Sequence, residues 1–572
     1  MLIAAQDGYL QSGFNSLALT SFARHFSQGF ALALTGLLVA RVIASKAEGF
    51  ARRVVFALTL CGSYAFAGCW LPHLPFHTQS LEGTNALVCQ ALSVAAAIEA
   101  TVILFYAPFR RNRLTLALVV LTLALAIMLT SIAGLLRGAP AEWPTRPNVI
   151  LISLDTLRTD HLSCYGYERE TTPRIDRFAA QGMRFTRAHA PHPWTLTSHM
   201  SMMTGLLPTE HGVEGNRRLS SSLPTLAELY EEAGYNTLAL IDPVVWLDKR
   251  YGFDRGFSSY RRIYGSAEEK IAMLETVFDD LQGEPFFLFL HYFDAHSDNS
   301  KLPYDSSNEE FKELCDWYTG DFAGCDTGGR CASEFLQAVN RNQATVDADT
   351  ERYIVDLYDA GIATMDRRLG QLFDQLEEHG LYENSIVVLT SDHGEEFREH
   401  GLFLHGTHFQ ECVSVPLIVR TPGRIDPSTT ERLVSHVDLA STLLQLCGIE
   451  SSRVGGRSFA PLIARGIDTK RRNPIFFDGQ DGALGVRLGD WKLVESRGET
   501  FLFDLASDPA EQRNLIDTQP EPKQLAELRA LIEIKLRQIR EQNEASSNDV
   551  QAVDLSEDDL RELKNLGYAG DH

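Results

Sequence analysis

The sequence predicts an α/β fold: a mainly parallel central sheet flanked by helices, a small C-terminal antiparallel sheet, and a preceding α-helical membrane domain. Short apolar runs recur after residue 147 and alternate with helical stretches, which is typical of parallel strands covered on both faces. Gly-punctuated, alternating segments after residue 471 favour hairpins. The expected strands of the central sheet are 148–155, 236–242, 285–294, 385–392 and 415–423.

Four apolar segments predict a transmembrane domain of about four helices at 26–43, 54–70, 86–109 and 114–136. The last two are long enough to cross a hydrocarbon core of about 30 Å. The loops after the first and third segments are basic, whereas the loop between the second and third has no Lys or Arg. By the positive-inside rule, the N-terminus and everything after residue 136 then face the periplasm or the exterior. We therefore expect an integral protein of the cytoplasmic (inner) membrane; a buried helical domain is the alternative.

The chain divides by composition into five parts. We expect a transmembrane domain at 1–140, a linker at 141–147 and a catalytic α/β domain at 148–470. A C-terminal antiparallel sheet and helix follow at 471–545, and an acidic tail with a short helix at 546–572.

Charge is distributed unevenly along the chain. Residues 1–140 hold nine Lys or Arg and four Asp or Glu, a net charge of +5, which leaves −28 for the remainder. So negative a part would repel polyanions at long range, which excludes a nucleic-acid-binding role.

Three cysteines, Cys315, Cys325 and Cys331, lie in one polar, Gly-rich stretch. In an oxidising exterior two of them can pair, and the sequence leaves the pairing open. A metal knuckle is less favoured, because no CxxC or nearby His accompanies them.

Acidic residues end three of the expected strands: Asp155, Asp294 and Asp392. Ligands of open α/β sheets bind beyond the carboxyl ends of the strands. His393 follows Asp392 directly, and carboxylate with imidazole suits Zn²⁺ or Mn²⁺, with Ca²⁺ as a further option. The pattern predicts a metal or acid–base site.

Thr195 precedes a Met-rich helical run in the stretch "PWTLTSHMSMMTG". A hydroxyl at a helix N-terminus would lie where free N–H groups favour an anion. A Thr hydroxyl is a weak nucleophile and would need a cation to activate it. The stretch therefore indicates either a nucleophile or only the start of a core helix, and Thr197 or Ser198 are minor alternatives for the nucleophile.

Seven stretches in order resemble the sulfatase family of the alkaline phosphatase superfamily. They are "NVILISLDTLRTDHLSCYGY", "TLTSHMSMMTGLLPTEHGV", "FLHYFDAH", "SDHGEEFREHG", "VSVPLIVRTPG", "VSHVDLASTLLQLCGI" and "FLFDLASDPAEQRNL", and they span about 148–515. The resemblance implies a metal-assisted covalent mechanism with Asp155, Thr195, Asp392 and His393 as the metal ligands.

One departure from the family pattern concerns the nucleophile. Sulfatases have a Cys or Ser, matured to formylglycine, where this chain has Thr195, and Thr cannot become a formyl aldehyde. In this respect the chain resembles phosphoryl-transferring relatives: phosphoethanolamine transferases, lipoteichoic acid synthases and nucleotide pyrophosphatase-type phosphodiesterases.

The resemblance also implies roles for further side chains. His296 and His405 are the expected catalytic acids, and His199 and Arg158 are the expected substrate contacts, with an ion pair as the alternative for Arg158. Asp294 is a weaker candidate for a second metal.

The leading interpretation is therefore a membrane-anchored metalloenzyme that hydrolyses or transfers phosphate esters or diesters, on lipid head groups or envelope polymers. The alternatives are a sulfate-ester hydrolase that lacks formylglycine and a catalytically silent membrane binding protein. The sequence leaves open the physiological substrate, the choice between phosphate and sulfate and between hydrolysis and transfer, the metal and the number of ions, and the oligomeric state.

Overall fold

The computed structural model describes residues 146–553 except 265–266, 282, 298–303, 305–311, 316, 319–331, 423–427, 467, 469–472, 480–481, 497, 519, 521 and 546–551, and also residue 556. The predicted transmembrane domain, Cys325, Cys331 and most of the acidic tail lie outside these residues. Within them, no helix is both long enough and apolar enough to cross a membrane. Both sheets belong to one compact unit.

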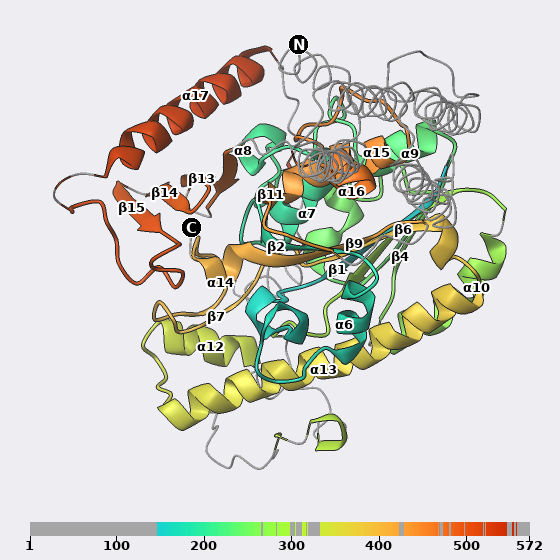
Figure 1. Ribbon diagram of the computed structural model, residues 1–572, viewed down its shortest axis with the longest axis horizontal. Helices are drawn as coiled ribbons and strands as arrows, with labels where there is room; N and C mark the ends of the chain where they lie inside the picture. Colours follow the sequence, from blue (N-terminus) through green and yellow to red (C-terminus); the bar gives the residue numbers. More distant parts are fainter. Residues whose placement is uncertain are drawn as a thin grey trace, which may run out of the picture. The chain divides into compact units, whose positions relative to one another are not determined.

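A mixed sheet, with nine strands in the described part of the chain, forms the centre of this unit (Figure 1). Its order is β10-β2-β9-β6-β1-β5-β3-β4, and β11 also pairs with β2. The strands are β1 (Asn148–Leu154), β2 (Met183–His189), β3 (Asn236–Ile241), β4 (Ser259–Arg262), β5 (Phe286–Tyr292), β6 (Ser385–Thr390), β9 (Ser414–Arg420), β10 (Ser428–Thr430) and β11 (Val434–Ser435).

The predicted α/β class with a mainly parallel sheet is confirmed, and one strand runs in the opposite direction. Neighbouring strands are parallel except that β9 runs antiparallel to both β2 and β6. The run at 415–423 looked like the other strands because β9 is almost wholly buried, and a continuous apolar run carries no information on direction. The sequence also missed β2, in which polar and apolar residues mix, and the four-residue β4.

Helices cover both faces of the sheet, as expected for buried strands (Figure 1). Alternate residues of β1 face opposite layers: Val149 and Leu151 join one apolar cluster, and Ile150 and Ile152 the other. The first layer contains α7 (Thr195–Thr204), α9 (Leu226–Glu232), α15 (Leu439–Leu446) and α16 (Ala460–Arg465). The second contains α6 (Pro173–Ala179), α10 (Ala267–Asp280), α12 (Ala332–Asn340) and the long α13 (Ala348–Glu378).

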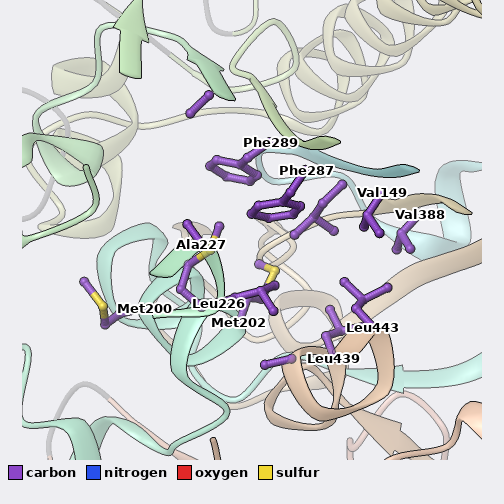
Figure 2. Packing of buried hydrophobic residues seen from close by; sticks show 14 of the residues in the cluster. Val149, Met200, Met202, Leu226, Ala227, Phe287, Phe289, Val388, Leu439 and Leu443 are labelled. Atoms are coloured by element: carbon purple, nitrogen blue, oxygen red, sulfur yellow. The ribbon is translucent and has the colours of Figure 1, made fainter. Parts of the chain in front are cut away.

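The Met-rich run after Thr195 is part of the core. All ten residues of α7 are buried. Figure 2 shows Met200 and Met202 of this helix in the same cluster as Phe287 and Phe289 of β5 and Leu439 of α15. This packing holds the N-terminus of α7 against the sheet.

A second, four-stranded antiparallel sheet follows in the chain, which confirms the predicted C-terminal sheet. Its strands are β12 (Ile475–Asp478), β13 (Leu484–Leu488), β14 (Trp491–Ser496) and β15 (Glu499–Asp504), paired in that order. Helix α17 (Lys523–Ala545) packs Leu525, Leu528 and Ile532 against one face of this sheet. Shorter elements are α8 (Pro208–His211), α14 (Gln410–Val413), the β7–β8 hairpin (Glu396–Phe397 and Phe403–Leu404), and 3₁₀ turns at Thr159–His161, Ser163–Tyr165, Val245–Leu247, Lys249–Tyr251, Tyr382–Asn384 and His436–Asp438.

Helix α7 ends at a glycine that two constraints require. Gly205 has φ of +72°, and a Cβ there would lie 2.6 Å from the carbonyl oxygen of Gly455. The left-handed conformation disfavours any L side chain, and the close backbone leaves no room for one.

We predict that Gly205→Ala destabilises the fold more than Gly380→Ala. Gly380 has a similar φ of +64° but no neighbouring atom within 4 Å of the added Cβ, so its substitution costs only the conformational strain of about 1–2 kcal/mol. Gly205→Ala adds a steric clash, which typically costs about 1–3 kcal/mol more. Chemical denaturation of both variants measures the difference, and equal losses would show that the contact with Gly455 is relaxed.

Candidate active site

Two aspartates meet at the carboxyl edge of the central sheet. Asp155 directly follows β1, and Asp392 lies two residues after β6. The two strands are parallel neighbours, with Ser153 opposite Thr390. Parallel strands end at the same edge, so the pairing brings both carboxylates together, and both are fully buried.

The imidazole of His393 lies between these carboxylates. Its Nε2 is 3.4 Å from Asp392 Oδ2 and 3.9 Å from Asp155 Oδ1. Its Nδ1 lies 2.9 Å from the carbonyl oxygen of Gly394. A carbonyl oxygen only accepts, so Nδ1 donates, and in the neutral ring the lone pair of Nε2 points toward the two acids.

Thr195 faces the same imidazole from the first turn of α7. Its Oγ1 lies 3.2 Å from His393 Nε2. The neighbouring hydroxyls are directed elsewhere: Thr197 donates to the carbonyl of Trp194, and Ser198 to the carbonyl of Asp392. Of the three hydroxyls considered from the sequence, only Thr195 is directed toward His393 and its acids.

Burial controls the electrostatics of this cluster. It raises the pKa of Asp155 to about 7, partly opposed by His393. Burial also raises the pKa of Asp392, and Asp155 raises it further. Burial disfavours the charged form of His393, but Asp392 and Asp155 outweigh it and raise the pKa of that imidazole. The two buried carboxylates therefore favour a positive charge close to them.

The donor set fits a divalent cation. Asp155, Asp392 and His393 each offer one ligand atom, and these atoms lie within 4.8 Å of one another. Asp155 Oδ1 and Asp392 Oδ2 are buried and have no hydrogen-bond partner among the described residues, and such oxygens are costly unless a cation or proton satisfies them. Two carboxylates with one imidazole suit Zn²⁺ or Mn²⁺ and admit Ca²⁺.

Two unusual backbone positions support the cluster. Thr156 has φ of +56°, and its N–H donates to Asp392 Oδ1 over 3.3 Å. At Gly394 a Cβ would lie 1.9 Å from the carbonyl oxygen of Glu411. The segment after His393 therefore passes too close to α14 for any other residue.

His291 is a site residue that the sequence analysis missed. It lies in β5, and its Nε2 is 3.0 Å from Asp155 Oδ2. Burial lowers the pKa of His291 to about 3, which favours the neutral ring. This contact orients Asp155 and would leave Oδ1 free to bind a cation. The signal was a His inside an apolar strand, but only the strand pairing reveals which face it occupies.

His199 contacts the backbone of Thr195 and the side chain of Ser153. Its Nδ1 is 2.8 Å from the carbonyl oxygen of Thr195, and its Nε2 is 2.9 Å from Ser153 Oγ. Both ring nitrogens thus contact the fold, which favours a positioning role. The substrate contact proposed for His199 stays a prediction.

Arg158 forms the ion pairs that the sequence analysis gave as its alternative. Its guanidinium lies 2.7 Å from Asp160 and 2.6 Å from Glu399. It also donates to the carbonyl of Glu395 over 3.0 Å. These contacts hold the segment after His393 in place, and a direct contact of Arg158 with substrate stays a prediction.

His405 and His296 lie next to His393. The ring centroids of His393 and His405 are 4.4 Å apart, and those of His405 and His296 are 5.3 Å apart. His405 Nδ1 is 3.2 Å from Glu395 Oε2, a second contact that the sequence analysis missed. Burial lowers the pKa of both His296 and His405. The structure thus places His405 against His393, the imidazole that Thr195 also contacts, with His296 next to His405.

Asp294 lies apart from this arrangement of ligands. Its Oδ1 accepts hydrogen bonds from the N–H of Ala267 and from Arg368 Nη1, at 3.1 and 2.7 Å. These contacts tie Asp294 to α10 and α13, and a role at a second metal has no support from them.

Comparison with known proteins decides the family. Residues 147–449, more than half of the chain, match the sulfatase family. The chain belongs to the sulfatase family. Residues 398–542 also match the C-terminal domain of N-sulphoglucosamine sulphohydrolase.

Individual relatives agree with this assignment. The chain is 24% identical over 518 residues to N-acetylglucosamine-6-O-sulfatase of Bacteroides thetaiotaomicron, which covers 73% of this chain and 91% of that protein. Two solved structures share the fold. One, in complex with its substrate D-glucosamine-2-N,6-O-disulfate, has a TM-score of 0.55 at 22% identity and covers 69% of this chain and 98% of its own. The phosphonate monoester hydrolase of Agrobacterium radiobacter has a TM-score of 0.52 at 21% identity, with coverages of 72% and 99%.

We predict that Asp392→Asn lowers the amount of divalent metal that the purified protein retains. The substitution keeps the shape of the side chain but removes the charge of one ligand. Asp366→Asn is the matched control, because Asp366 is also a buried carboxylate but accepts from the N–H groups of Arg174 and Ile175. Elemental analysis after dialysis measures bound metal, and equal retention in the two variants would remove Asp392 from the ligand set.

Proposed function

We propose that this sulfatase-family protein is a metal-dependent hydrolase of sulfate esters that uses the Thr195 hydroxyl as its nucleophile. The observation that carries the proposal is the position of Thr195 Oγ1, 3.2 Å from His393 Nε2, the nitrogen that also lies 3.4 Å from Asp392 Oδ2 and 3.9 Å from Asp155 Oδ1. The sulfatases among its relatives support sulfate as the substrate over the phosphate that the Thr alone suggests.

Asp155, Asp392, His393 and Thr195 are the residues that would hold the cation. When bound, a divalent cation lowers the pKa of a coordinated hydroxyl and neutralises charge on the oxygens of an anionic ester. The hydroxyl of Thr195 is a weak nucleophile without activation, and a cation held by these residues would activate it.

In the proposed reaction, Thr195 attacks the ester and a histidine supplies the proton for the departing alcohol. Thr195 Oγ, having lost its proton to solvent, forms a bond to sulfur as the bond from sulfur to the alcohol oxygen breaks. His296 or His405 donates a proton to the departing alcohol from its protonated form, which burial disfavours. Water then cleaves the sulfo-threonine at sulfur, which releases sulfate and restores the Thr195 hydroxyl.

A second candidate is hydrolysis or transfer of phosphate esters and diesters. The observation that favours it is Thr195 itself, since a Thr ester of a tetrahedral phosphorus centre is formed and cleaved by the same geometry. Lipid head groups are substrates of this kind and fit the membrane domain predicted at 1–140. The membrane domain stays a prediction, and so does the position of the later residues on the periplasmic or exterior side.

We predict that wild-type protein loaded with Zn²⁺, Mn²⁺ or Ca²⁺ hydrolyses an aryl sulfate, and that Thr195→Ala reduces kcat by at least about 10³-fold, as loss of a nucleophile does. Thr195→Ser keeps the hydroxyl and is the conservative control. A panel of aryl sulfate, aryl phosphodiester and aryl phosphomonoester substrates measures the activities. Mass spectrometry of quenched reactions with isotopically labelled substrate identifies the adduct on Thr195.

The outcomes separate the candidates. Turnover of the phosphodiester without the sulfate would replace the first proposal by the second. Undiminished turnover in Thr195→Ala would exclude Thr195 as the nucleophile. Turnover of none of these esters by metal-loaded protein would favour a binding role, against which the complete set of Asp155, Asp392 and His393 argues.

A further inference from the structure

A buried ion pair lies behind the active site and has no part in the mechanism described above. Asp242 directly follows β3, and Lys270 lies in α10. Lys270 Nζ is 2.6 Å from both carboxylate oxygens of Asp242. The Lys270 side chain is 0% exposed and that of Asp242 is 6% exposed.

Such a pair is poor evidence for stability. Removing two charges from water costs several kcal/mol per ion, and the attraction in the interior repays this only in part. The same pair constrains geometry strongly, because each charge holds the other in place. The role of this pair therefore depends on the other groups that Asp242 and Lys270 contact.

Asp242 also holds the segment that carries His296. Its Oδ2 accepts a hydrogen bond from the backbone N–H of Phe293 over 2.8 Å. The carbonyl of Phe293 accepts in turn from the N–H of His296 over 3.0 Å. The rings of Phe293 and His296 stack, with centroids 4.0 Å apart and an interplanar angle of 17°.

A second set of contacts, made by Asp294, holds the same turn. Asp294 accepts hydrogen bonds from the first helical N–H of α10, that of Ala267, and from Arg368 of α13. Helix α10 thus contacts the turn twice, through Ala267 directly and through Lys270 and Asp242. The turn from Phe293 to His296 is held to elements of the layer that lies opposite α7.

We propose that Asp242, paired with Lys270, is a positioning residue that sets the orientation of the His296 ring through Phe293. This proposal rests on the proposed function in taking His296 as the acid that protonates the departing alcohol. A displaced ring would slow only the reactions that need this proton. Misplacement by about 1 Å costs on the order of 10²-fold in rate.

The leaving group distinguishes this role from a merely structural one. An alkyl alcohol is a poor leaving group and needs protonation, whereas a nitrophenolate departs without it. Asp242→Asn keeps an acceptor for the N–H of Phe293 but leaves Lys270 without its counter-charge. We expect Asp242→Asn to lower kcat for an alkyl sulfate by about 10- to 100-fold, with a change of less than about threefold for 4-nitrophenyl sulfate and little change in KM.

A double-mutant cycle with His296→Gln tests the coupling. If Asp242 acts through His296, adding Asp242→Asn to His296→Gln causes little further loss on the alkyl ester. Additive losses, or equal losses on both esters, would overturn the proposal. Asp366→Asn is the matched control for the change of a buried carboxylate, and we expect it to leave the leaving-group dependence unchanged.

Two further variants keep the test valid if Asp242→Asn folds poorly. Phe293→Leu removes the ring that stacks on His296 while the ion pair stays intact, and the double substitution of Asp242→Asn with Lys270→Met removes the unpaired charge. Both should reproduce the selective loss on the alkyl ester. Wild-type leaving-group dependence in folded protein of both variants would overturn the proposal.

A measurement without activity separates this inference from the proposed function. In protein labelled with ¹⁵N-histidine, the His296 ring signal is assigned from its loss in His296→Gln. We expect it to shift in Asp242→Asn and not in Asp366→Asn. If the wild-type protein hydrolyses neither sulfate nor phosphate esters, the proposed function fails while this shift still reports the positioning of His296. No shift would overturn the positioning of His296 by Asp242.

Discussion

The site depends on one constraint: two carboxylates and an imidazole are held together in a buried place. Asp155 and Asp392 would repel each other as anions without water to screen them, and burial alone raises the pKa of both. A cation held between them and His393 would remove this conflict. The strand order supplies the geometry, because β1 and β6 are adjacent and parallel. The buried face of α7 then brings Thr195 to the same point.

The sequence predicts the parts of the fold that follow from local pattern and misses those set by pairing. Strands β1, β3, β5 and β6 are apolar runs between turn residues, and α13 shows a helical repeat, so each was expected. Strand β2 alternates imperfectly, with a burial pattern that reflects its place beside the edge strand β10. The antiparallel direction of β9 arises from its neighbours, and no residue within the run specifies it.

The site was also predictable only in part, because some of its residues follow from local sequence pattern and others from strand pairing. Residues that follow strands, such as Asp155 and Asp392, are visible as acids after apolar runs. His291 lies within a strand, and its role depends on the register that places Ser153 of β1 opposite it. Asp242 also ends an apolar run, but its link to His296 passes through the backbone of Phe293, which no sequence pattern encodes. The choice between sulfate and phosphate is equally hidden, since both are tetrahedral anions that need the same ligands.

If Thr195 is the nucleophile, as proposed, the second half of the reaction differs from that of an enzyme with formylglycine. The hydrate of an aldehyde bears a second hydroxyl, so its ester with sulfate can break at carbon and release sulfate without attack on sulfur. Thr195 has no second hydroxyl, so its ester is cleaved only by attack of water on sulfur or phosphorus. This step needs a base close to Thr195 after the alcohol has left. His405, held by Glu395 and next to His393, is our candidate for that base, and His296 is our candidate for the acid of the first step. Under the proposed mechanism, each of the two proton transfers then has its own histidine.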